Sequence, residues 1–255
     1  MRSAIFLSVR NKATRLPGKA FLDLGGAPVT QRLLERLRES RETDRVVLTT
    51  STHPDDAVLV DLARRAGVEA FRGSEDDKLD RYLQAARAHG ADFVVVVDGD
   101  DPLCDPGYID RVIRRGRESG ADYVRCTGLP VGVAAGGIRV AALARVCALK
   151  TEADTEVWGG YFTETGLFTV VELAADPAHT APHLRMTLDY PEDYAFFQEV
   201  FRELGEGGRV FTLDEVFALL ARRPDIAKIN QGAQAAYEAN LRRITRIGMR
   251  TELPA

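Results

Sequence analysis

One stretch near the amino terminus predicts both the fold and the position of a binding site: Leu7-Ser8-Val9-Arg10-Asn11-Lys12-Ala13-Thr14-Arg15-Leu16-Pro17-Gly18-Lys19. The apolar residues 4–9 are typical of a buried strand, which ends abruptly in a loop with four basic side chains. In an open α/β sheet, ligands bind at the carboxyl ends of the strands, where N–H groups and basic side chains hold phosphate oxygens. A solvated basic loop is the alternative, but the position directly after a buried strand favours polyanion binding.

The basic loop matches neither of the two common phosphate-binding motifs. Lys19 is followed by Ala20 and no paired glycine precedes it, so the loop is not a Walker motif. The dinucleotide fingerprint Gly-x-Gly-x-x-Gly is absent as well.

The composition narrows the class of protein. A chain of 255 residues with 45% hydrophobic and 28% charged residues suits one soluble α/β domain over residues 1–255. A net charge of −4 argues against a nucleic-acid-binding surface. No apolar run reaches membrane-spanning length, and the amino terminus lacks a signal-peptide pattern. Three cysteines without a metal-site spacing are typical of reduced thiols, so we expect a cytoplasmic protein.

Strand and helix patterns alternate along the first half of the chain. The predicted strands are residues 4–9, 45–50, 68–71, 92–97 and 122–126. The predicted helices between them are residues 29–38, 58–66, 80–88 and 109–117. This alternation predicts a right-handed, doubly wound, mostly parallel sheet, with residues 92–97 as its central strand.

The pattern loosens after residue 126. We interpret residues 127–184 as a β-containing excursion off the main sheet, with strands at 138–140 and 167–171 and a helix at 141–149. A strand at 184–188 and helices at 192–204, 213–222 and 233–246 complete the chain.

Acidic residues follow two of the predicted strands. Asp98 and Asp100 are two residues apart after the central strand, so they are expected to share one face, with Asp101 pointing away. Carboxylates at this edge suit Mg²⁺, although a turn of Asp and Gly is an equal alternative. Asp189 ends the predicted strand at 184–188, and the acids Glu192 and Asp193 after it suit a helix amino terminus.

Three motifs, in order, resemble those of cytidylyltransferases, most closely the CMP-Kdo and CMP-acylneuraminate synthetases and their spore-coat-polysaccharide relatives. Those enzymes carry Ala-Arg-x-x-Ser-x-Arg-Leu-Pro-Gly-Lys, and residues 9–19 match it except at Val9 and Ala13. They carry Gly-Asp-Glu-Pro-Leu where this chain has residues 99–103, and Asp-x-Pro-Glu-Asp where it has residues 189–193. The loop at 72–77 also resembles the spore-coat-type relatives.

The resemblance implies a Rossmann-like, GT-A-like nucleotidyltransferase fold and a Mg²⁺-dependent transfer of CMP from CTP, with release of pyrophosphate. It implies Asp100 and Asp189 as the Mg²⁺ ligands and Lys19, Arg15 and Arg10 as the catalytic cations. The residues expected to bind the nucleotide are Ser8, Val9, Arg10, Lys12, Thr14, Arg15, Lys19, Thr50, Arg72, Gly73, Ser74, Asp80 and Asp98. It also implies a homodimer, with residues 127–184 as the acceptor-binding or dimerisation segment.

The sequence leaves open which acceptor the protein uses and which nucleobase its nucleotide carries. Residues 154–162 lack the histidine found in relatives that take sugar acids, so a small phosphonate such as phosphonoformate is as suitable as a sugar acid. Trp158 in this segment is expected in the core or an interface rather than in a ligand contact. A nucleotidyltransferase for another NTP, and a non-catalytic nucleotide-binding protein of the same fold, stay as alternatives. The four scattered histidines do not support a triad hydrolase.

Overall fold

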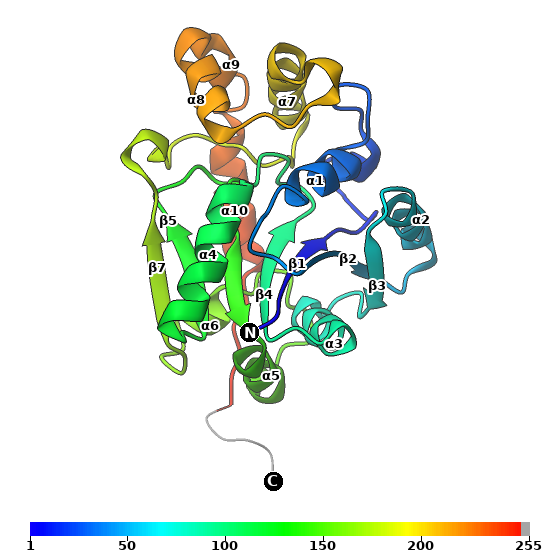
Figure 1. Cartoon of the computed structure of the whole chain (residues 1–255), viewed down its shortest axis with the longest axis vertical. Helices are drawn as coiled ribbons and strands as arrows, with labels where there is room; N and C mark the ends of the chain where they lie inside the picture. The colour runs from blue at the N-terminus through cyan, green and yellow to red at the C-terminus, as the bar shows by residue number, and fades with distance from the viewer. Residues whose placement is uncertain (251–255) are drawn as a thin grey trace.

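The structure, a computed structural model, describes residues 1–250 and is built on one seven-stranded sheet with helices on both faces (Figure 1). The strand order is β3-β2-β1-β4-β6-β5-β7. The strands are β1 (Ser3–Ser8), β2 (Arg45–Ser51), β3 (Glu69–Gly73), β4 (Phe93–Asp98), β5 (Tyr123–Thr127), β6 (Gly136–Arg139) and β7 (Val170–Ala174). Among the described residues β6 alone runs antiparallel to its neighbours, which confirms the mostly parallel α/β sheet.

Ten α-helices lie in the described residues. They are α1 (Val29–Leu37), α2 (Ala57–Arg65), α3 (Lys78–His89), α4 (Pro106–Ser119), α5 (Val140–Leu149), α6 (Gly160–Thr163), α7 (Pro191–Leu204), α8 (Leu213–Arg222), α9 (Pro224–Lys228) and α10 (Ala233–Ile244). Short 3-10 turns lie at Lys19–Phe21, Pro54–Asp56, Pro177–His179 and Glu206–Gly208. None of the helices within residues 1–250 combines the length and the apolar character that crossing a membrane requires.

The alternation of side chains along β1 builds two cores, one on each face of the sheet. Ile5 and Leu7 pack into a core with α1, α2 and α4, which α7 and α8 extend. Ala4 and Phe6 pack into a second core with α3, α5 and α6. Because both faces are covered, the open ends of the strands are where the sheet can bind a ligand.

The strands within residues 127–184 complete the main sheet, so the expectation of an excursion off the sheet is wrong for them. β6 lies between β4 and β5, and β7 pairs with β5 in parallel. Gly136 and Gly137 permit this insertion, because a Cβ atom would lie 2.5 Å from the Tyr123 hydroxyl at Gly136 and 2.6 Å from the Phe93 ring at Gly137. These two glycines therefore belong to a strand that fits between large aromatic side chains.

Residues 184–188 do not form the predicted sheet strand. They run across the carboxyl end of β4, where Met186 N donates to Val131 O at 2.8 Å and Leu188 N donates to Asp100 O at 2.7 Å. Gly132, with φ +89°, allows this close passage, because a Cβ there would lie 2.1 Å from the Met186 carbonyl oxygen. The segment thereby carries Asp189 to the end of β4.

Trp158 lies in the core, as expected, with 9% of its surface exposed. Its ring contacts Tyr82, Tyr123 and Phe162 edge-on at centroid distances of 6.0–6.2 Å. Such edge-to-face packing is favourable for aromatic side chains, so Trp158 is explained by packing.

Candidate active site

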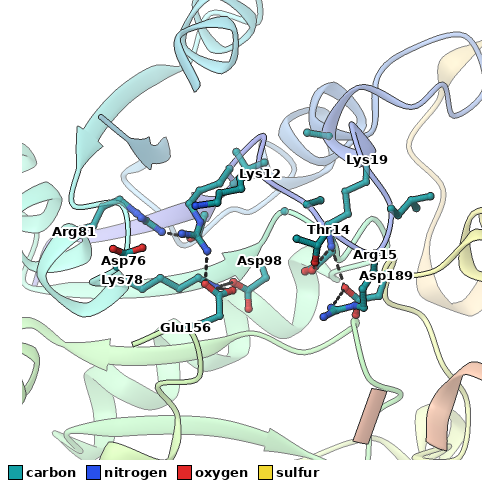
Figure 2. A pocket seen from close by; sticks show the side chains of 18 of the residues that line it. Lys12, Thr14, Arg15, Lys19, Asp76, Lys78, Arg81, Asp98, Glu156 and Asp189 are labelled. Atoms are coloured by element: carbon teal, nitrogen blue, oxygen red, sulfur yellow. Dashed lines mark hydrogen bonds and ion pairs between the residues drawn. The ribbon is translucent and has the colours of Figure 1, made fainter. Parts of the chain in front are cut away.

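A cleft of about 320 Å³ opens at the carboxyl ends of β1 and β4 (Figure 2). It is bounded by the basic loop, the start of α3, the turn after β4, the segment before α6 and the segment before α7. It is lined by Ser8, Val9, Arg10, Lys12, Ala13, Thr14, Arg15, Leu16, Lys19, Ala20, Asp76, Lys78, Arg81, Asp98, Gly99, Asp100, Asp154, Glu156 and Asp189. The structure thus brings together the predicted catalytic, metal-binding and phosphate-loop residues.

Lys19 lies at the centre of one end of the cleft. Its ammonium nitrogen Nζ is 2.7 Å from Asp100 Oδ2 and 3.1 Å from Asp189 Oδ1, and it also donates to Leu188 O. Arg15 donates to the same Asp189 oxygen at 2.5 Å. Burial works against the charge of Lys19, but the two carboxylates outweigh it and raise the pKa of the ammonium. Lys19 is therefore charged and held between the two predicted metal ligands.

Three carboxylates gather at the end of β4. Oxygens of Asp98, Asp100 and Asp101 lie within 4.8 Å of one another. Asp101 does not line the cleft, as expected, but its carboxylate stays close to the other two. This is because β4 ends at Asp98 and the chain turns there, with Asp101 N donating to Asp98 O at 3.1 Å. Burial and the charges of Asp100 and Asp98 raise the pKa of Asp101 well above its usual value. Such a cluster is a site where a cation relieves the repulsion.

The other end of the cleft carries an ion-pair network that sequence reasoning did not find. Glu156 pairs with Arg10 at 2.5 Å and with Lys78 at 2.9 Å, and Lys78 also pairs with Asp98 at 3.1 Å. Burial opposes the charge of Glu156, but Lys78 and Arg10 together lower the pKa of its carboxyl to about 2. Figure 2 shows Glu156, Lys78 and Asp98 on one side of the cleft and Lys19, Arg15 and Asp189 on the other.

A signal for Lys78 is present in the sequence. It is the first residue of α3, after the Asp77 N-cap, where a basic side chain is unfavourable next to the positive end of the helix dipole. A nearly buried cation at that position needs a specific anionic partner, which the tertiary structure supplies. Glu156 gives no such signal, because its segment follows no regular pattern.

Ser8 closes the inner wall of the cleft. Its Oγ accepts from the Tyr82 hydroxyl at 2.8 Å and from Arg81 Nη2 at 3.3 Å. Arg81 is fully buried and also donates to Ser74 O, while its Nε has no partner among residues 1–250.

Five predicted nucleotide-binding residues do not line the cleft: Thr50, Arg72, Gly73, Ser74 and Asp80. Arg72 donates instead to the carbonyl oxygens of Ser51 and His53. Ser74 accepts from Asp77 N, and Asp80 accepts from Gln84. These contacts give each of the three polar side chains a structural role, and their binding of the nucleotide stays a prediction.

The comparisons with known proteins agree with this geometry. Residues 4–157, more than half of the chain, match the family model described as cytidylyltransferase. The chain belongs to the cytidylyltransferase family. It is therefore a nucleotidyltransferase that carries out CTP-dependent cytidylyl transfer.

Curated relatives extend the match beyond the family model. This cytidylyltransferase is 30% identical over 235 residues to the spore coat polysaccharide biosynthesis protein SpsF of Bacillus subtilis, covering 89% of this chain and 98% of the relative. It is 36% identical over 145 residues to the 3-deoxy-manno-octulosonate cytidylyltransferase of Anaeromyxobacter dehalogenans, covering 56% of this chain and 51% of that one.

Solved structures support the fold. A cytidylyltransferase from Leptospira borgpetersenii superimposes with a TM-score of 0.81 at 24% identity, over 89% of this chain and 97% of that one. A CMP:2-keto-3-deoxy-manno-octonic acid synthetase complexed with CTP superimposes with a TM-score of 0.63 at 16% identity, over 80% of this chain and 99% of that one. At these identities, the likeness establishes the nucleotidyltransferase fold of the cytidylyltransferase.

Proposed function

We propose that this cytidylyltransferase transfers CMP from CTP to a small acidic acceptor in a Mg²⁺-dependent reaction that releases pyrophosphate. The observation that carries the proposal is the position of Lys19 between Asp100 and Asp189 in one cleft. Cationic side chains suit a triphosphate and carboxylates suit a divalent cation, and both stabilise the charge that develops when a nucleotidyl group leaves a triphosphate.

The donor set fits a hard divalent cation. The clustered carboxylates of Asp98, Asp100 and Asp101 offer the oxygen ligands that Mg²⁺ prefers, and Asp189 contacts the same Lys19 ammonium as Asp100 does. We assign Asp100 and Asp189 as the residues that would hold the ion. When bound, Mg²⁺ would neutralise the negative charge on the phosphates.

The chain's own side chains have distinct roles in this reaction. Lys19 and Arg15 would hold oxygens of the triphosphate, and Arg10 would assist after exchanging Glu156 for a phosphate. An acceptor oxygen attacks the α-phosphorus and, where it belongs to a hydroxyl group, releases its proton to solvent. The bond from the α-phosphorus to the oxygen that bridges it to the β-phosphorus breaks, and pyrophosphate leaves with that oxygen. The protein contributes positioning and charge neutralisation rather than a covalent nucleophile.

We propose a sugar acid or a small phosphonate, such as phosphonoformate, as the acceptor. The names of the relatives support an acidic acceptor, since 3-deoxy-manno-octulosonate carries a carboxylate. Glu156 reaches the cleft from residues 127–184, which supports the assignment of this segment to acceptor binding. Dimerisation through the segment, the homodimer and the cytoplasmic location stay predictions.

The test is pyrophosphate release from CTP and Mg²⁺ with a panel of acceptors: Kdo, neuraminate-type sugars and small phosphonates. Release with one acceptor and CTP, and not with UTP, GTP or dTTP, supports the proposal and identifies the acceptor. Release with another NTP would contradict the choice of CTP. Nucleotide binding without release for the whole panel would favour a non-catalytic protein.

A further inference from the structure

A buried group of polar side chains lies directly behind Asp189. Arg185, Asp193 and Asn230 are each at most 3% exposed. None of them lines the cleft. The sequence explains Asp193 as a helix-capping acid, and it does accept a hydrogen bond from Tyr190 N at 3.0 Å. This cap accounts for only one of its contacts.

Asp193 is the centre of the group and accepts five hydrogen bonds. Arg185 donates to it through both Nε and Nη2, each at 2.8 Å, in a two-point ion pair. Asn230 donates at 2.9 Å, and the backbone N–H groups of Asp189 and Tyr190 donate at 2.9 and 3.0 Å. A carboxylate is needed to accept this many donors at once.

Arg185 also contacts Asp189 from the side opposite the cleft. Its Nη2 lies 3.4 Å from Asp189 Oδ2, whereas Asp189 Oδ1 faces the cleft and accepts from Lys19 and Arg15. The guanidinium is held in place by the ring of Tyr237, 4.6 Å from the centroid. One oxygen of Asp189 therefore faces Arg185 in the interior, and the other faces the cleft, where Lys19 and Arg15 contact it.

The charge of Arg185 would weaken cation binding at Asp189 if it were unbalanced. The two-point pair with Asp193 is shorter than the contact with Asp189, so the guanidinium charge is matched mainly by Asp193. Arg185 therefore offsets little of the negative charge of Asp189, which is available to attract a cation in the cleft.

Asn230 ties this arrangement to the carboxyl-terminal helices. It lies between α9 and α10, and its Nδ2 donates to Asp193 Oδ1 and to the Arg185 carbonyl oxygen, at 2.9 and 3.1 Å. All three residues lie outside the stretch 4–157 that matches the family model.

We propose that Asp193, with Arg185 and Asn230, is a positioning residue for the metal-binding carboxylate of Asp189. Asp193 holds the Asp189 backbone, and it balances Arg185 so that Asp189 offers one charged oxygen to a divalent cation. This inference rests on the proposed function, in which Asp189 binds the ion.

The test compares Mn²⁺ binding to the full-length protein and to Asp193→Asn, without nucleotide. The amide has the same size but cannot balance Arg185, which is then free to pair with Asp189. Loss of a residue that orients a metal ligand typically lowers metal affinity by about 10- to 100-fold. We expect a loss in this range and a higher KM for Mg²⁺, with kcat recovered at saturating Mg²⁺ and CTP binding in EDTA unchanged.

Asp110→Asn is the matched control. Asp110 is a nearly buried carboxylate on α4 that accepts from the backbone N–H groups of Arg41 and Glu42, and it does not line the cleft. Its loss is expected to lower the melting temperature without changing Mn²⁺ affinity. Asn230→Ala, which removes one donor to Asp193, is expected to lower Mn²⁺ affinity by less than Asp193→Asn does. It replaces Asp193→Asn in the test if that variant does not fold.

The outcomes separate the two proposals. If the wild type binds Mn²⁺ and releases pyrophosphate while Asp193→Asn folds with Mn²⁺ affinity within twofold of the wild type, the positioning role is overturned and the proposed function stands. An unchanged affinity in Asn230→Ala, when Asp193→Asn does not fold, overturns it as well. If the wild type itself binds no divalent cation, both proposals are overturned.

Discussion

Lys19 and Asp100 form an ion pair of 2.7 Å at one end of the cleft, and Asp189 contacts the same ammonium group at 3.1 Å. The ammonium therefore lies between the two carboxylates that are expected to hold Mg²⁺. Since Lys19 is also expected to bind the triphosphate, a metal ion at these carboxylates would release Lys19 for the phosphates. We therefore expect metal binding and nucleotide binding to be coupled through this one side chain.

Replacement of Lys19 tests the coupling. Lys19→Met is expected to lower the rate of pyrophosphate release by about 100- to 1,000-fold, the range seen when one preorganised electrostatic contact is removed. In the absence of nucleotide it is expected to bind Mn²⁺ more tightly, because a competing cation is gone. Lys228→Met, on the exposed surface of α9, controls for the loss of one positive charge. Weaker Mn²⁺ binding by Lys19→Met would contradict the coupling.

Replacement of Asp100 is expected to impair catalysis while nucleotide binding is kept. Asp100→Asn is expected to lower turnover by several orders of magnitude, because one of the two charged metal ligands is lost. CTP is still expected to raise the melting temperature, since the basic loop is intact. The control is Asp92→Asn, which lies just before the opposite end of β4 and accepts from Arg2 N. Near-normal turnover by Asp100→Asn would end the assignment of the metal site.

The ion pairs of Glu156 are expected to make the free energy of unfolding depend on pH. Despite burial, which opposes its charge, Lys78 and Arg10 lower the pKa of Glu156 to about 2 in the folded protein, against 4.5 for a free side chain. The folded state therefore gains stability from the charged carboxyl above pH 4.5, and loses this gain as the pH falls toward 2. Thermal melts of Glu156→Gln should show a deficit at pH 7 that shrinks below pH 4.5. A deficit that is constant with pH would contradict the ion-pair network.

Trp158 tests the packing of the second core. Trp158→Ala removes a ring that contacts three aromatic neighbours, and a change of this kind costs about 3–5 kcal/mol of unfolding free energy. Because Trp158 does not line the cleft, KM for CTP should stay unchanged. Denaturant unfolding measures the free energy of unfolding, and initial rates measure KM for CTP. A large rise in KM with little loss of stability would instead indicate a ligand contact.

The first half of the fold was predictable because its signals are local. The predicted strands at 4–9 and 92–97 match β1 and β4 to within a residue at each end, since an apolar run bounded by polar turns is a short-range pattern. The position of β6 was not predictable in this way, because it depends on how Gly136 and Gly137 fit against Tyr123 and Phe93 from other strands. The path of residues 184–188 likewise depends on Gly132, about fifty residues earlier in the chain.

By itself, the amino-acid sequence determined the alternating α/β pattern, the basic loop at the end of β1 and the acidic motifs at Asp100 and Asp189. These follow from the period of apolar residues and from short motifs, which need no knowledge of distant contacts. Only the tertiary structure decided that Glu156 pairs with Arg10, 146 residues away, and that Asp193 and Asn230 support Asp189 from behind. Contacts of this kind depend on the packing of whole elements, because burial is what makes a charged side chain require a particular partner.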